Sequence, residues 1–104
     1  MFGFFRKTRM DITAAQVFWK WFAENEEWII DNIPKDPQNV ILTINEFITP
    51  VFPYYYYQLD FEVGVNRELS VFDCGYIELR RDIKRFKKMM PADLKQRWTF
   101  LTGK

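Results

Sequence analysis

The spacing of apolar residues changes twice along the sequence, and this change constrains the fold more than any other feature. Up to residue 51, apolar side chains recur every three or four residues, as on one face of an α-helix. From residue 54 to residue 63 the period becomes two, which is typical of a half-buried strand. Residues 77–90 return to helical spacing. The pattern predicts an α+β fold.

The first helical region begins with a capping pattern. Residues 13–16 (Thr-Ala-Ala-Gln) have the form of a capping box, and Ile12 and Val17 occupy the positions of a hydrophobic staple. One helical face over residues 17–33 gathers the side chains that we expect in the core: Val17, Phe18, Trp21, Phe22, Trp28, Ile29 and Ile33. Trp19 lies on a flanking ridge. It is either an anchor for a partner or a side chain packed on a neighbouring helix or loop.

Proline residues mark the limits of a second helix. Asp36 followed by Pro37 predicts an N-cap and a first helical residue. Pro50 and Pro53 predict an end near residues 49–53, because the residue before a proline disfavours α geometry. The apolar side chains in between keep helical spacing: Val40, Ile44, Phe47, Ile48 and Val51.

Three strands are expected in the rest of the chain. Residues 54–63 form the first, residues 64–67 supply a turn, and residues 68–74 return as the second strand of a hairpin. A third helix covers residues 77–90, and residues 97–101 alternate again as a last strand. A right-handed crossover through that helix would bring the last strand parallel to the second.

The predicted element order is therefore α-α-β-β-α-β, in one two-layer domain over residues 1–104. Helices cover one face of a three-stranded sheet, and residues 1–10 form a flexible or peripheral terminus. The sheet side of the core is expected to contain Leu59, Phe61, Leu69, Val71, Trp98 and Phe100. A content of 48% apolar and 19% aromatic residues argues against intrinsic disorder.

The composition removes several classes of function. The chain has no His, so the usual neutral-pH acid/base group and every His-containing metal set are excluded. The single Cys74 excludes an internal disulfide and a Cys-cluster metal site, and it agrees with a reducing, cytoplasmic location. Asp73 beside it would raise the thiol pKa, the wrong direction for a nucleophile. We expect no enzyme activity and no cofactor.

The N-terminus combines aromatic and basic residues. Phe2, Phe4 and Phe5 precede three cations, whereas a signal peptide places its charges first and follows them with a longer apolar run. No apolar run approaches the ~20 residues needed to cross a bilayer. The three rings are either a weak peripheral anchor on a membrane or a partner, or a frayed terminus over a core edge.

Three short motifs carry a resemblance to known sequences. Residues 18–22 read Phe-Trp-Lys-Trp-Phe, residues 59–62 read Leu-Asp-Phe-Glu, and residues 97–100 read Arg-Trp-Thr-Phe. With these motifs the chain resembles a loose group of small bacterial α+β proteins that begin with a short, Phe-rich and basic segment. The resemblance implies a small cytosolic domain and carries no catalytic residue set.

The uncovered sheet face is the first candidate site. It is expected to carry Tyr56, Gln58, Asp60, Glu62, Ser70, Phe72, Cys74, Arg97 and Thr99. Exposed rings beside an arginine suit a protein interface, whereas base stacking would require surrounding positive charge. A third interpretation is a solvated face on which Arg97 pairs with carboxylates. Asp60 and Glu62 alone are weak evidence for catalysis or a metal ion.

The third predicted helix is the second candidate site. Residues 80–104 hold nine bases and two acids, whereas residues 11–62 hold nine acids and two bases. The basic side chains of the helix are Arg80, Arg81, Lys84, Arg85, Lys87 and Lys88. They either contact nucleic acid or an anionic membrane surface, or they are solvated and paired with acids.

The leading hypothesis is a non-enzymatic protein-interaction or regulatory domain, which binds another protein or a second copy through Trp19, Tyr56, Phe72 and Arg97. The alternative is an electrostatic binder that uses the basic helix.

Overall fold

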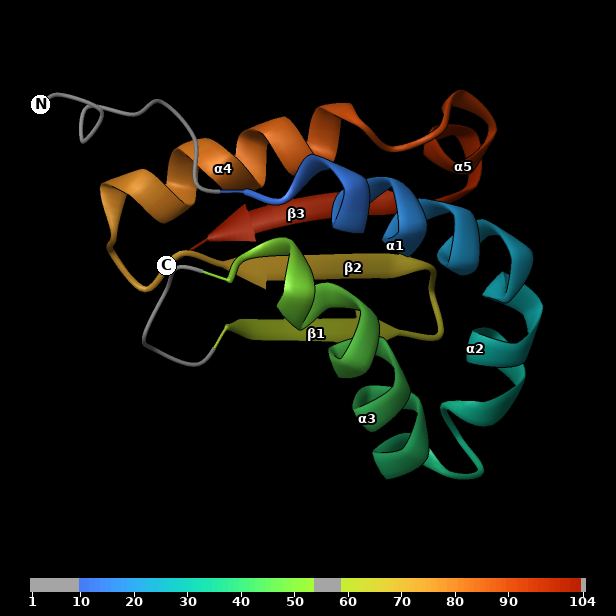
Figure 1. Cartoon of the computed structure of the whole chain (residues 1–104). Helices are drawn as coiled ribbons and strands as arrows, with labels where there is room; N and C mark the ends of the chain where they lie inside the picture. Colours follow the sequence, from blue (N-terminus) through green and yellow to red (C-terminus); the bar gives the residue numbers. More distant parts are fainter. Residues whose placement is uncertain (1–9, 54–58, 104) are drawn as a thin grey trace, which may run out of the picture.

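A computed structural model describes residues 10–53 and 59–103 of the chain. The α+β fold predicted from the sequence is confirmed (Figure 1). The helices are α1 (Ile12–Glu24), α2 (Glu26–Asn32), α3 (Pro37–Ile48), the 3-10 helix η2 (Thr49–Val51), α4 (Ile77–Lys88) and α5 (Ala92–Arg97). The strands are β1 (Asp60–Gly64), β2 (Glu68–Phe72) and β3 (Thr99–Gly103).

The three strands form one mixed sheet in the order β1-β2-β3. β1 and β2 are an antiparallel hairpin that pairs Glu62 with Ser70. β2 and β3 run parallel, as predicted, and pair Leu69 with Phe100. The connection between them contains α4 and α5, and α4 runs alongside β3 (Figure 1). β1 and β3 are thus the two edges of the sheet.

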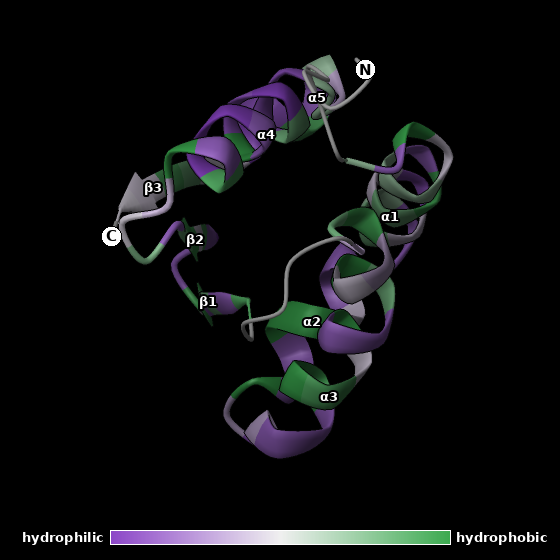
Figure 2. Cartoon of the chain, turned by 60° about the vertical axis from the view of Figure 1, so that its left-hand side comes forward, coloured by the Kyte–Doolittle hydropathy of each residue, from purple (hydrophilic) through white to green (hydrophobic). Residues whose placement is uncertain are grey.

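The described helices lie on one side of the sheet, and none of them covers the other side (Figure 2). Leu69 and Val71 of β2 are fully buried on the covered side. Aromatic rings fill the space between sheet and helices: the Phe18 and Phe86 centroids are 5.1 Å apart. Those of Phe22 and Trp98 are 4.8 Å apart. The core predicted for the sheet is confirmed, with Leu59 and Phe61 partly buried at its margin.

The start of α1 differs from the predicted capping box. Asp11 is the N-cap, and its carboxylate accepts a hydrogen bond from the Ala14 backbone N–H at 2.9 Å. Because this carboxylate satisfies a free amide of the first turn, the helix begins at Ile12. Ile12 and Val17 are 46% and 51% exposed. The predicted staple and the core position of Val17 are therefore wrong.

The predicted first helix is divided at Asn25. The backbone of this residue has a φ of −120°, and its side-chain amide donates to the Trp21 carbonyl at 2.9 Å. A short polar side chain that binds its own helix carbonyls favours a helix end. α2 restarts at the next residue, and Glu26 is buried as a result.

The last strand begins later than predicted. Residues 92–97 form α5, and β3 starts at Thr99. Pro91 precedes α5 with an extended backbone and fits the start of a helix because proline lacks the N–H that a first turn leaves unpaired. Arg97 therefore ends a helix and does not lie on the sheet. Within the described residues the predicted first strand corresponds to β1, which begins at Asp60, and residues 54–58 of that prediction lie outside the described residues.

Candidate functional site: a lysine-rimmed hollow

Trp19 is a core residue. Its side chain is 2% exposed, and the indole N–H donates to the Phe86 carbonyl oxygen at 3.0 Å. The two rings also stack, with centroids 4.8 Å apart. The hypothesis that Trp19 anchors a partner is wrong, because α4 occupies the ridge on which it lies.

The uncovered sheet face is acidic rather than aromatic in its described part. Asp60 and Glu62 are exposed on β1, and Glu68 follows on β2. Phe72 is half-buried, and its ring lies next to the backbone of Gly103 on the neighbouring strand. Of the other predicted anchors on this face, Tyr56 lies outside the described residues, as do Phe2, Phe4 and Phe5 of the N-terminus. The described face therefore offers one partly accessible predicted ring.

Arg97 belongs to an ion-pair cluster around the buried carboxylate of Glu26. Its guanidinium donates to both Glu26 oxygens, at 3.1 and 2.6 Å. Arg67 and the Trp98 indole N–H donate to Glu26 Oε1 at 2.9 and 3.0 Å. The hydrogen bond from Arg97 lowers the pKa of Glu26, and that from Trp98 acts in the same direction. Pairing of Arg97 with acids of the sheet is therefore wrong, because its partner lies on α2.

The cations of α4 divide into two groups. Arg80 Nε contacts Asp73 at 2.9 Å, and Arg85 contacts Asp82 at 3.4 Å, with both carboxylates buried. Arg81 is exposed on the outer side of the helix. Lys84, Lys87 and Lys88 form no ion pair with any residue that the structure describes. The interpretation that these cations pair with acids thus holds for Arg80 and Arg85, and the three lysines can contact a ligand.

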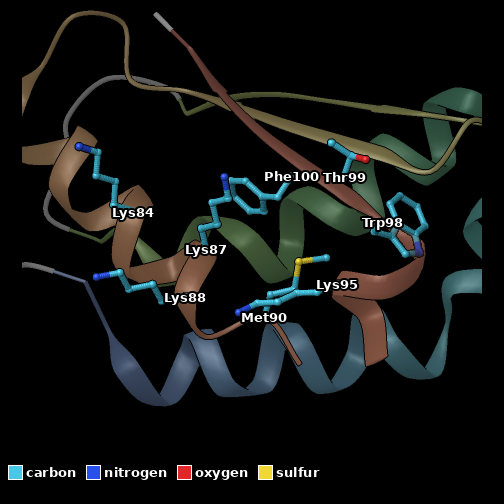
Figure 3. A pocket seen from close by; sticks show the side chains of 8 residues that line it. All are labelled: Lys84, Lys87, Lys88, Met90, Lys95, Trp98, Thr99 and Phe100. Carbon is cyan, nitrogen blue, oxygen red and sulfur yellow. The ribbon is translucent and has the colours of Figure 1, made fainter. Parts of the chain in front are cut away.

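These lysines line one side of a hollow between α4, α5 and β3 (Figure 3). The hollow has a volume of about 610 Å³. We call Lys84, Lys87, Lys88 and Lys95 its lysine rim. The other lining residues are Met90, Trp98, Thr99 and Phe100.

The hollow is apolar inside and positive around its edge. Met90, Trp98 and Phe100 are nearly buried and present only narrow apolar surfaces at its base. Lys87 Nζ lies 6.0 Å from the centroid of the Phe100 ring, a distance at which cation and ring attract each other. Lys95 is exposed on α5 and, like its neighbours, has no ion-pair partner among the described residues. Four cations that share one concave surface produce a positive potential there.

Sequence reasoning missed two residues of this region. Lys95 was not assigned to a site because the helix that carries it was predicted as loop and strand; Pro91 four residues earlier was the available signal for that helix. Glu26 was missed because helical periodicity was continued through Asn25. An asparagine followed by two glutamates is itself a typical start of a new helix.

The predicted second strand ends at Phe72, so Cys74 follows β2 in a turn and does not lie on the sheet face as predicted. The Cys74 thiol lies 3.6 Å from Asp60 Oδ2. Partial desolvation, the hydrogen bond to Asp60 and the nearby negative charges raise the pKa of the thiol. Among the residues that the structure describes, no three Cys, Asp or Glu side chains are placed to hold a metal ion.

A second hollow, of about 430 Å³, lies on α3 between Pro37, Gln38, Ile41 and Leu42. None of these lining residues is charged, so the hollow has no electrostatic preference for a charged ligand.

No helix in the described ranges is both long and apolar enough to cross a bilayer. Comparison of the chain with protein-family models, curated protein sequences and solved structures found no match. The resemblance to small bacterial α+β proteins stays a prediction.

Proposed function

We propose that this chain is a non-enzymatic binding domain for an anionic partner, and that the lysine rim is its contact surface. The observation that carries this proposal is one hollow lined by four lysines, three from α4 and one from α5. Lysine is a compact cation on a flexible stem and binds carboxylate or phosphate groups without a fixed fork geometry. Such a rim suits a partner with several negative charges.

The contrast between arginine and lysine supports the proposal. Arg67, Arg80, Arg85 and Arg97 each contact a buried carboxylate, so their charge is used inside the domain. The lysine rim has no such partner in the described residues. Part of its charge stabilises the C-terminal end of α4, where cations face the negative end of the helix dipole. That role does not require Lys95, which lies on a separate helix.

The sheet face is a weaker candidate for the same partner. Its described acids, Asp60 and Glu62, repel an anionic ligand. The protein-interaction hypothesis therefore moves from the sheet face to the opposite, basic part of the domain. A protein partner remains part of the proposal, with an acidic surface as its contact.

Binding of labelled anionic probes tests the proposal. We suggest fluorescence anisotropy with a short polyglutamate and a short oligo-dT, at about 50 mM and about 200 mM salt. The test variant is Lys84→Glu with Lys87→Glu. The matched control is Lys20→Glu with Lys35→Glu, which changes the net charge equally at exposed positions outside the hollow.

The proposal predicts that at least one probe binds and weakens as salt is raised. The rim variant should lose about tenfold or more in affinity, and the control should lose far less. Equal losses in the two variants would mean that net charge alone attracts the probe. That result, or no binding of either probe, would overturn the proposal.

A further inference from the structure

β3 is an edge strand beside the lysine rim. It pairs only with β2 among the described residues, so the other side of its backbone faces away from the sheet. Thr99 and Phe100 of this strand also line the hollow (Figure 3). The backbone edge and the four cations thus belong to the same surface.

The register identifies the backbone groups that are available at this edge. The Thr99 N–H donates to the Arg67 carbonyl at 2.9 Å, and the Gly103 carbonyl accepts from the Asp73 N–H at 2.8 Å. Both residues therefore direct their backbone polar groups toward β2. Because successive residues of a strand alternate in this direction, those of Phe100 and Thr102 point away from β2. No hydrogen bond within the described residues is recorded for their outward N–H groups.

The edge lacks the features that usually prevent strand addition. β3 reads Thr-Phe-Leu-Thr-Gly and contains neither proline nor a charged side chain. Leu101 is 43% exposed on it. Natural sheets usually protect such an edge with charges on the strand, a proline or a bulge. Here the nearby charges lie on α4 and α5, where they can contact an added strand.

The spacing of the cations fits an extended acidic chain. Lys84 and Lys88 are one helical turn apart, a rise of about 6 Å along α4. Side chains on one face of a strand recur about every 6.8 Å. α4 runs alongside β3, so acidic residues at alternate positions of an added strand can face successive lysines (Figure 1). Pairing of β3 with β3 of a second copy would bring two lysine rims together, and their repulsion disfavours it.

We propose that an extended acidic segment of another protein adds to β3 as a fourth strand, with acidic side chains at alternate positions directed to the lysine rim. This inference rests on the proposed function and names the partner of the same site. Main-chain hydrogen bonds to Phe100 and Thr102 would supply affinity, and the lysines would supply selectivity for acidic sequences.

The test uses a blocked peptide of about nine residues with glutamate at every second position and threonine between. Two further peptides carry backbone N-methyl groups, one on all glutamates and the other on all threonines. Only one of these two sets of amides can face β3 in a given register. We therefore expect one methylated peptide to lose about tenfold or more in affinity and the other to bind like the parent.

Hydrogen exchange of the full chain gives a second readout. The amides of Phe100 and Thr102 should exchange about tenfold or more slowly with the parent peptide bound, and the Lys84→Glu, Lys87→Glu variant should lose this protection.

If binding needs the lysines but both methylated peptides bind alike and these amides stay unprotected, strand addition is wrong and anion binding stands. If oligo-dT binds and the peptide does not, the acidic segment is wrong. If the peptide binds equally well without the lysines, the inference and the proposed function both fail. Protection of these amides by self-association, without peptide, would also overturn the inference.

Discussion

Arg97 binds both carboxylate oxygens of Glu26, with N···O distances of 3.1 and 2.6 Å. This contact joins the end of α5 to the first residue of α2. Arg67 extends it to the turn of the hairpin and lies 5.9 Å from the Trp98 ring centroid. Because α5 and the start of β3 frame the hollow, the Glu26 cluster positions one side of the candidate site.

Replacement of Glu26 should destabilise the fold strongly. Glu26→Ala removes the acceptor of three donor side chains, and we expect a loss of about 3 kcal/mol in the free energy of unfolding. The adjacent Glu27 is the matched control, because its side chain is 74% exposed and, among the described residues, forms an ion pair with Arg67 only. Glu27→Ala should cost less than about 1 kcal/mol. Urea denaturation measures both values, and similar losses would show that the cluster does not stabilise the fold.

The same cluster predicts a specific acid sensitivity. Hydrogen bonding to Arg97 keeps the folded-state pKa of Glu26 below its usual value. The resulting stabilisation is fully present above the unfolded-state pKa of about 4.3 and is lost as the pH falls through the lower folded-state pKa. The wild-type free energy of unfolding should therefore fall more steeply below pH ~4.3 than that of Glu26→Gln. Parallel pH profiles for the two proteins would contradict this assignment.

Trp19 should matter for stability and not for binding. Trp19→Phe removes the indole hydrogen bond to the Phe86 carbonyl, which still accepts from the Met89 N–H at 3.1 Å, and it also removes part of a buried ring, at a total cost of about 2 kcal/mol. Trp21→Phe is the control: Trp21 stacks on Phe47 but has no recorded indole hydrogen bond in the described residues. It should cost about 1 kcal/mol or less. Thermal unfolding and probe binding check this; a binding defect with unchanged stability would restore Trp19 as an interface residue.

The Cys74 thiol should react slowly with alkylating agents. Desolvation and the contact with Asp60 raise its pKa, so little thiolate is present near neutral pH. Asp60→Asn removes the nearest negative charge and should accelerate maleimide labelling about two- to threefold at pH ~8. Glu62→Gln removes an equal charge two residues further along β1, and the labelling rate of this variant should stay close to that of the wild type. Equal acceleration in both variants would exclude a specific effect of Asp60.

Hydrophobic periodicity was sufficient to predict the strands of the sheet and the helix at α4, because these features depend on which residues are apolar. The parallel pairing of β2 with β3 followed from the right-handed crossover rule. The N-cap of α3 was also predictable, since Asp36 acts through a contact only three residues away.

The errors have local physical causes. Asp11 caps the first helix in place of Thr13, and Asn25 divides it, because short polar side chains compete for nearby backbone groups. The Arg97–Glu26 pair joins residues 71 positions apart, and no one-dimensional pattern indicates it. The lysine rim was recognised in part, as a basic helix. The lysines could be separated from the arginines of the same helix only in the structure, where Arg80 and Arg85 pair with buried carboxylates.

Chemical footprinting of lysines locates the surface that contacts an anionic partner. The full chain is acetylated with and without a saturating acidic probe, and each modified lysine is quantified by mass spectrometry. We expect the probe to protect Lys84, Lys87, Lys88 and Lys95 severalfold and to leave Lys20 and Lys35 as reactive as in the free protein. Uniform protection, protection centred on Lys20 and Lys35, or none at any of these lysines would contradict the assignment of the hollow as the binding site.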